Sequence, residues 1–127
     1  MTEKRLSLGR RGEELACKYL KKAGYKILEL NYRGHLGEID LVAEDGGCLV
    51  FVEVKTRSSL AFGHPLESIN SRKQHQLIRT AREYLAEHGA EERICRFDAV
   101  SVLQKGEQEP PLELIQNAFE LDGGNCR

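Results

Sequence analysis

The stretch GEIDLVAEDGGCLVFVEVK, residues 37–55, predicts two β-strands joined by a tight turn. Both halves are rich in Val, Ile, Leu and Phe, residue types that favour strands. Gly46 and Gly47 follow Asp45 between the halves, which is typical of a two-residue hairpin turn. Charged residues interrupt segments of otherwise buried character, so this hairpin is both the centre of the predicted fold and the first place to seek a site.

The alternation of strand side chains predicts which hairpin residues share a face. With Gly46-Gly47 as the turn, Asp45 faces Cys48, and Asp40 lies opposite Glu53. One face then carries Glu38, Asp40, Val42, Phe51, Glu53 and Lys55, and the other, a core face, carries Ile39, Leu41, Ala43, Val50, Val52 and Val54. A turn at Asp45-Gly46 would slip the pairing by two and keep the faces, whereas a three-residue loop without a bulge would break them.

The charged face brings Asp40 and Glu53 together, with Glu38 opposite Lys55. Directly opposed residues have Cβ atoms about 5 Å apart, and like charges in that position destabilise a sheet. A divalent cation would remove the repulsion, and Mg²⁺ suits carboxylates whose partners are water and a substrate phosphate. The alternative is an ordinary solvated strand face with a Glu38–Lys55 pair. The spacing of Asp, twelve residues and Glu-x-Lys favours the metal site, because it matches the PD-(D/E)xK nuclease pattern, with Ile39 in place of the Pro.

The length of 127 residues predicts a single domain, 1–127, with an ordered core of about 7–119 and a tail at 120–127. Hydrophobic residues make up 40% and charged residues 31%, and no apolar run approaches the length of a membrane span. The first residues lead into no apolar signal region, so we expect a cytoplasmic protein without membrane contact. The four cysteines contain no C-x-x-C pair, which predicts reduced thiols instead of a zinc site or disulfides.

The net charge of −1 hides an uneven distribution. Residues 1–35 carry nine Lys or Arg against four Asp or Glu, whereas residues 98–127 carry two against six. A nucleic-acid partner would therefore meet a local basic surface. Solvation of a surface helix by Lys and Arg explains much of the same pattern.

The rest of the chain predicts an α/β fold in the order α-β-β-β-α-β-β, with helices flanking a mixed central sheet. We expect helices at 7–23 and from 71 to about 89, the second opened by a Ser71–Gln74 capping box. Strands are expected at 25–32 and 96–103, and residues 112–119 form a short strand or an extended tail.

Several residues outside the hairpin could serve the same site. Glu13 lies at the start of the first helix's apolar stripe, where it could reach over a sheet edge toward the carboxylates. Arg57 continues the alternation of Glu53 and Lys55 and is a candidate for phosphate contact, since Arg matches phosphate oxygens well. Arg33, in the connection before the hairpin, and Lys73, in the first turn of the second helix, are further phosphate-binding candidates.

The chain resembles the bacterial YraN-type family, an uncharacterised family that is similar to archaeal Holliday-junction resolvases and to the restriction-endonuclease-like fold. The resemblance runs from Gly9 to about Phe119. It rests on Gly9-x-x-Gly12-Glu13, Gly24-Tyr25, Asn31-Tyr32-Arg33, residues 37–43, residues 51–57, Phe62-Gly63, Lys73, Tyr84-Leu85 and Arg96-Phe97-Asp98.

The resemblance implies a restriction-endonuclease-like three-layer fold and a role for each site residue. Glu13 takes the place of the resolvases' helix glutamate, Asp40 and Glu53 take the metal-binding places, and Lys55 takes that of the catalytic lysine. In such nucleases the carbonyl between the acid and the lysine, here that of Val54, also meets the metal. Resolvases act as dimers on symmetric junctions, so a homodimer is part of the same expectation.

The leading hypothesis is a Mg²⁺-dependent endonuclease, with Mn²⁺ as a substitute, that hydrolyses nucleic-acid phosphodiesters, structured or branched DNA among them. DNA ranks before RNA as the partner, although no base-reading motif decides between them. The alternatives are a nucleic-acid-binding protein on a nuclease fold that does not cut, and a protein-interaction domain on the same fold.

Overall fold

The hairpin expected from the sequence forms, and the fold is built outward from it. Strands β2 (Glu38–Asp45) and β3 (Cys48–Arg57) are antiparallel, with Asp45 opposite Cys48. Gly46 and Gly47 have φ values of 57° and 88°, left-handed conformations that this turn requires and that glycine adopts without a steric penalty. The predicted two-residue turn and the register beside it are confirmed.

One sheet contains all five strands, in the order β1-β2-β3-β4-β5. The computed structural model describes residues 3–57, 69–103 and 112–119, with side chains from residue 10 onward. The outer strands are β1 (Lys26–Arg33), β4 (Cys95–Leu103) and β5 (Leu112–Phe119). Only the β3–β4 step is parallel, and helix α2 (Ser71–Glu87) lies in that crossover connection.

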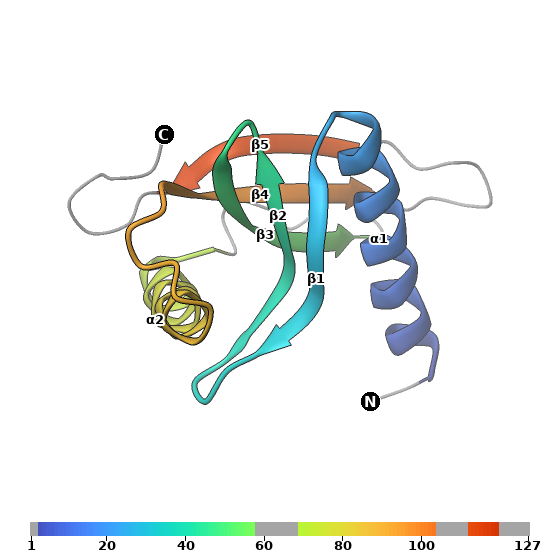
Figure 1. Cartoon of the computed structure of the whole chain (residues 1–127). Helices are drawn as coiled ribbons and strands as arrows, with labels where there is room; N and C mark the ends of the chain where they lie inside the picture. The colour runs from blue at the N-terminus through green and yellow to red at the C-terminus, as the bar shows by residue number, and fades with distance from the viewer. Residues whose placement is uncertain (1–2, 58–68, 104–111, 120–127) are drawn as a thin grey trace.

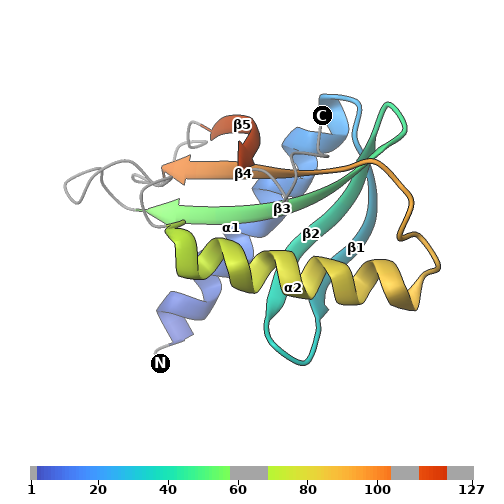
Figure 2. The ribbon, with the colours of Figure 1, turned by 90° about the vertical axis from the view of Figure 1, so that its left-hand side faces the viewer.

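Two helices cover opposite faces of the sheet and make three layers. Helix α2 lies in front of the sheet and α1 (Glu3–Lys22) lies behind it in Figure 2. Leu77 and Ile78 of α2 pack in one buried cluster with Val42 and Phe51. Ala16 and Leu20 of α1 pack in a second cluster on the other face, together with Leu41, Ala43, Val50 and Val52. The predicted α/β class and element order are confirmed, and both faces of the hairpin are buried beside the turn.

The helix ends differ from the expectation in two places. α1 begins at Glu3, four residues before Ser7, since Glu-Lys-Arg-Leu is a run of good helix formers. α2 begins at Ser71 as predicted, but the capping box is wrong. Asn70 is the N-cap, and its Oδ1 accepts the Lys73 backbone N–H at 3.0 Å.

Some expectations fall on parts of the chain that the structure does not describe. The loop after Arg57, the connection at 104–111, the tail at 120–127 and Cys126 lie outside the described residues. Among the described cysteines, no disulfide joins Cys17, Cys48 and Cys95 to one another. No helix of the described ranges is long and apolar enough to span a membrane.

Candidate functional site

The candidate site opens where β2 and β3 separate. The ladder between them runs from Asp45–Cys48 to Leu41–Val52 and ends there. Beyond that point β2 stays paired with β1 as far as Arg33–Glu38, and β3 stays paired with β4 as far as Arg57–Leu103. Figure 1 shows β1 and β2 turning away from β3 at this end. The separation leaves backbone groups without a ladder partner and makes room for side chains between the strands.

Asp40 fills this gap with its own side chain. Its Oδ2 accepts a hydrogen bond from the Val54 backbone N–H at 2.8 Å. The carboxylate thus replaces the carbonyl that a continued β2–β3 ladder would have supplied, which satisfies a donor that would be costly to bury unpaired. Asp40 is therefore fixed against the peptide that precedes Lys55.

The predicted division of the hairpin into two faces is wrong at this point. Ile39 lies in the buried cluster on the α2 face with Val42 and Phe51, whereas Leu41 lies on the α1 face. The cause lies in the neighbouring strand β1, where Asn31 has a φ of 51°. Asn31 stands between the pairs Leu30–Leu41 and Tyr32–Ile39, at the level where β2 changes faces. A left-handed residue reverses the alternation in β1, and β2 follows it, so Asp40 points into the gap.

The expected Glu38–Lys55 opposition does not form either, because the β2–β3 ladder ends before it reaches these residues. Glu38 instead forms an ion pair with Arg33 of β1, Nε to Oε2 at 3.2 Å. Lys55 stays on the same face of β3 as Glu53. This follows because Thr56 faces Gly12 of α1, and in a strand the residues on either side of Thr56 must face the other way.

Glu53 is buried on the α2 side of the gap. Its side chain is 8% exposed, and its Oε2 lies 3.3 Å from the Lys73 ammonium of α2. This contact is an ion pair without hydrogen-bond geometry, so Oε2 is a buried acceptor that lacks a hydrogen bond from the described residues. A buried carboxylate oxygen in this condition is a ready ligand for a cation.

The two carboxylates of the gap strongly affect each other. Burial raises the pKa of Asp40 to about 9, with further increases from its hydrogen bond to Glu53 and from the Glu53 charge. The Val54 N–H opposes this increase, because it favours the ionised form. The balance of these effects favours the protonated form of Asp40.

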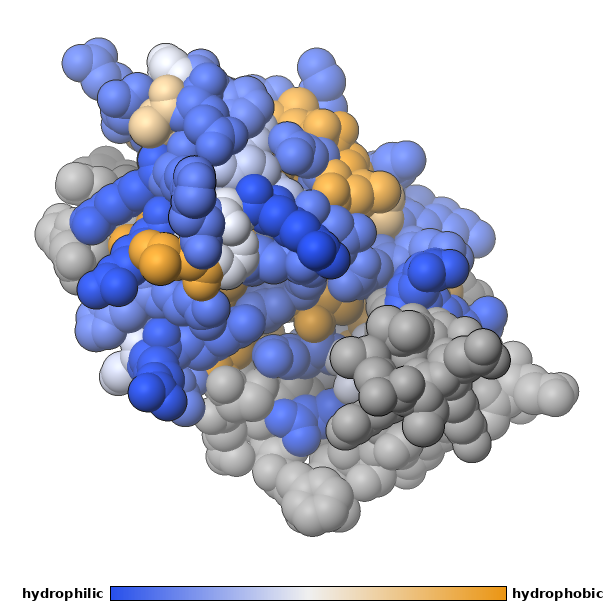
Figure 3. Space-filling view, turned by 90° about the horizontal axis from the view of Figure 1, so that it is seen from below, coloured by the Kyte–Doolittle hydropathy of each residue, from blue (hydrophilic) through white to orange (hydrophobic). Residues whose placement is uncertain are grey.

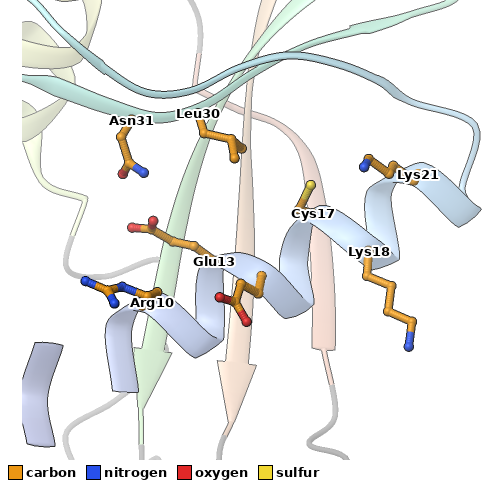
Figure 4. A pocket seen from close by; sticks show the side chains of 8 residues that line it. Arg10, Glu13, Cys17, Lys18, Lys21, Leu30 and Asn31 are labelled. Carbon is orange, nitrogen blue, oxygen red and sulfur yellow. The ribbon is translucent and has the colours of Figure 1, made fainter. Parts of the chain in front are cut away.

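Glu13 approaches the same charges from the first helix. Burial raises the pKa of its carboxyl, a hydrogen bond with Asn31 lowers it, and the charges of Glu38 and Glu53 raise it again. Figure 4 shows the Glu13 side chain pointing from α1 toward Asn31. The sequence-based expectation that Glu13 reaches over a sheet edge toward the carboxylates is consistent with this arrangement.

An open pocket of about 490 Å³ gives access to the carboxylates. Asp40, Glu53, Glu38, Arg33 and Lys73 line it, together with Gly34, Gly37 and Gln76. The structure therefore brings together both hairpin acids and two of the predicted phosphate-binding residues. Arg57, the third, lies at the end of β3, and its Nε is buried without a hydrogen-bond partner among the described residues.

The β1–β2 turn forms one wall of this pocket and is held against α2. Gln76 Nε2 donates to the Leu36 carbonyl at 2.8 Å, and the His35 backbone N–H donates to Glu83 at 2.9 Å. The His35 ring also contacts Glu83. A Cβ on Gly37 would lie 2.9 Å from Gln76 Nε2, so the turn packs closely on the helix. The side on which this turn projects is mainly hydrophilic, with separate apolar patches (Figure 3).

Sequence reasoning missed Asn31, Gln76 and Glu83 as residues that shape the pocket. An asparagine inside a predicted strand was an available signal, because Asn is one of the few residues that tolerate a left-handed conformation. Gln76 and Glu83 carried no such signal. Their roles depend on contacts with a turn about 40 residues earlier in the chain.

The residues present suit a hard divalent cation. Magnesium is typically held by one or two carboxylates plus water and phosphate, and Asp40 and Glu53 provide two carboxylates beside the Val54 peptide. The Oε2 of Glu53, which accepts no hydrogen bond from the described residues, fits the same ion. Among the described residues, however, no three His, Cys, Asp or Glu side chains lie close enough to hold a metal by themselves. Water or substrate would have to complete the coordination.

Comparison with known proteins places the chain in a family. The model of "Uncharacterised protein family UPF0102" matches residues 12–102. The chain belongs to the UPF0102 family. This match contains β1 to β3, α2, all of β4 except Leu103 and the part of α1 that carries Glu13, so it covers all the site residues named above. The resemblance to the YraN-type family is thereby confirmed.

Relatives of this UPF0102 chain match it over almost their whole length. A UPF0102 protein of Syntrophotalea carbinolica is 45% identical over 97% of this chain and 99% of the relative. One of Moorella thermoacetica is 48% identical over 94% of this chain and 100% of the relative. One of Geobacter metallireducens is 49% identical over 91% of this chain and 93% of the relative. Their shared name specifies a family and no activity.

Proposed function

We propose that the protein is a Mg²⁺-dependent nuclease with a restriction-endonuclease-like fold, which hydrolyses nucleic-acid phosphodiester bonds. The observation that carries the proposal is the pair of buried carboxylates, Asp40 and Glu53, at the point where β2 and β3 separate. Ionisation of both carboxylates at once is costly in this buried position, and a bound cation would offset that cost. The pocket that exposes them also contains Arg33 and Lys73, which suit an anionic ligand.

The residues take the following roles in this proposal. Asp40 and Glu53 hold Mg²⁺, together with the Val54 carbonyl. The bound ion supplies Lewis-acid polarisation of the phosphate and a lowered pKa for its water. Lys55 orients the attacking water and stabilises the negative charge that develops in the transition state. Glu13 positions waters or a second ion.

Arg33, Arg57 and Lys73 bind the phosphate backbone without reading sequence. Lys73 contacts Glu53 in the structure, and it would be free to turn to a phosphate once a metal neutralised that carboxylate. Arg33, whose side chain is largely exposed, can likewise exchange Glu38 for a phosphate oxygen.

The ion pair between Lys73 and Glu53 also favours a second candidate function. A carboxylate that is already paired with a lysine does not require a metal, which suits a nucleic-acid-binding protein that does not cut. The two candidates differ in whether cleavage occurs and in whether it depends on Asp40 and Glu53.

A cleavage assay distinguishes them. Labelled linear duplex, single strand, flap, four-way junction and structured RNA are incubated with Mg²⁺, with Mn²⁺ or with EDTA. Asp40→Asn and Glu53→Gln keep the shape of the side chains and remove the charges, so we expect both to fold and to lose at least about a hundredfold in rate. Glu92→Gln, which changes an exposed residue in the turn before β4, serves as the matched control and should cut like wild type.

Metal-dependent cutting that Asp40→Asn abolishes would support the nuclease and identify its substrate class. Cutting that persists in both variants would contradict the assignment of the site. Binding without cutting in every metal would favour the second candidate.

A further inference from the structure

A second open pocket lies on the α1 face of the sheet, between α1 and the edge strand β1. It has a volume of about 450 Å³. Three cations, Arg10, Lys18 and Lys21, line it beside two acids, Glu13 and Glu14, and its other lining residues are Cys17, Leu30 and Asn31. Figure 4 shows Arg10, Glu13 and Lys18 on one helix, with Leu30 and Asn31 of β1 above them. We call this pocket the α1–β1 groove.

The groove and the carboxylate pocket share no lining residue, but they approach each other at Glu13 and Asn31. Glu13 lines the groove, yet its carboxyl group feels the charges of Glu38 and Glu53 in the other pocket. Asn31, its hydrogen-bond partner, lies on β1 across from Asp40, where the strands change sides. Glu13 and Asn31 therefore mark the place where a ligand that extends from the carboxylate pocket around β1 would reach the groove.

The chemistry of the groove suits one strand of a nucleic acid. Arg10, Lys18 and Lys21 are exposed, and no described carboxylate forms an ion pair with any of them. Leu30 is 53% exposed and gives the groove an apolar wall. Cations beside an apolar surface match the alternation of phosphates and bases in a single strand.

The size of the groove suits an unpaired strand better than a double helix. Its volume lies at the lower end of the range of small-ligand pockets, about 300–1,000 Å³, which corresponds to one or a few nucleotides. A path from the α2 side of the sheet to its α1 side must also bend sharply around the end of β1. Bending a short duplex is costly, whereas an unpaired strand bends freely.

We propose that the α1–β1 groove binds an unpaired nucleic-acid segment next to the phosphate held in the carboxylate pocket. This inference rests on the proposed function and makes it more specific. The substrate class becomes nucleic acid with a single-stranded overhang, flap or branch, in preference to blunt linear duplex.

The test compares binding of two ligands to groove variants, in EDTA, by fluorescence anisotropy. The ligands are a labelled duplex with a single-stranded overhang and the same duplex with blunt ends. The groove variant is Lys18→Ala, Lys21→Ala. Its matched control is Arg11→Ala, Lys22→Ala, which removes the same charge from exposed positions of the same helix that do not line the groove. A third variant, Leu30→Glu, changes an exposed side chain and so should fold.

We expect wild type to bind the overhang duplex about tenfold more tightly than the blunt one. The groove variant and Leu30→Glu should lose this preference, and the control should keep it. Each phosphate contact to a single strand contributes about 0.7 to the slope of log affinity against log salt, so the groove variant's slope should fall by about 1.4. Equal affinity of wild type for both ligands, equal losses in the groove variant and the control, or no nucleic-acid binding would overturn the proposal.

Cleavage by the same proteins in Mg²⁺ separates this inference from the proposed function. Asp40-dependent cutting with no groove effect would contradict the groove alone. Groove-dependent binding without any cutting would support the groove and contradict the nuclease.

Discussion

Asp40 combines burial, a neighbouring carboxylate and a structural hydrogen bond in one side chain. Its Oδ2 holds the Val54 N–H where the ladder ends, which ties the residue to the fold. Burial and Glu53 oppose ionisation of the same group, so its pKa is raised from 3.8 to about 9. Groups with such conflicts are concentrated at functional sites, because a ligand can resolve them.

This shift predicts how the stability of the metal-free protein depends on pH. The folded state binds the Asp40 proton more tightly than the unfolded state does, so this proton stabilises the fold. Its contribution to the unfolding free energy is fully present below about pH 4 and is lost as pH rises through about 9. Between these two pH values the unfolding free energy falls by at most about 1.4 kcal/mol per pH unit. Asp40→Asn should flatten it and be more stable than wild type at pH 8.5. Urea unfolding in EDTA at pH 6 and 8.5 measures this.

Glu92→Gln again serves as the control, since an exposed residue should leave the pH dependence unchanged. If Asp40→Asn lost stability with pH in parallel with wild type, the raised pKa would be assigned to the wrong group.

At the scale of elements, the packing of α1 on β3 sets the position of Glu13. A Cβ on Gly12 would lie 1.9 Å from Thr56 Oγ1 and 3.1 Å from Thr56 Cβ. Glycine in a helix interior is about 1 kcal/mol less favourable than alanine, so close approach is the reason for the residue. The contact brings the next residue, Glu13, to the sheet edge beside the carboxylates.

Gly12→Ala should therefore destabilise the protein despite its gain in helix propensity. Overpacking costs typically about 1–3 kcal/mol, and displacement of α1 should also weaken cleavage. Thr56→Ala removes the Oγ1 and should partly rescue Gly12→Ala, which a double-mutant cycle of unfolding free energies detects as coupling. Strictly additive effects would contradict a direct contact between these positions.

At the scale of the whole molecule, a buried polar network on the α1 face joins strands far apart in the sequence. Asp98 accepts hydrogen bonds from Tyr25 Oη at 2.7 Å, Arg96 Nε at 2.8 Å and the Asn117 backbone N–H at 2.9 Å. Arg96 also reaches Asp45 beside the hairpin turn. The network thus links β2, β4, β5 and the start of β1. Both carboxylate oxygens of Asp98 accept hydrogen bonds, whereas Oε2 of Glu53 accepts none from the described residues.

Two carboxylates of this network provide a matched pair for a stability test. Both lie within 2.9 Å of Arg96, but the Asp98 side chain is 0% exposed and that of Asp45 is 31% exposed. Breaking a buried pair costs about 3–5 kcal/mol, whereas an exposed pair contributes about 0–1 kcal/mol. Asp98→Ala should therefore lower the unfolding free energy far more than Asp45→Ala. Equal losses in urea titrations would show that burial does not govern the network.

The sequence alone determined the features that depend on neighbours along the chain. Gly46-Gly47 specified the turn and the register beside it, and hydrophobic periodicity specified the order of helices and strands along the chain. These signals are local, since turn conformation and side-chain alternation depend on adjacent residues.

Only the tertiary structure decided how the charged residues of the site are arranged. The reversal of sides at Asn31 and Asp40, the contact of Lys73 with Glu53 and the approach of Glu13 all involve elements that are distant in sequence. Regular alternation predicted Asp40 opposite Glu53 as a ladder pair, but the strands separate before that pair. The separation accompanies the docking of the β1–β2 turn on α2, a packing interaction that the pattern of a single strand cannot specify.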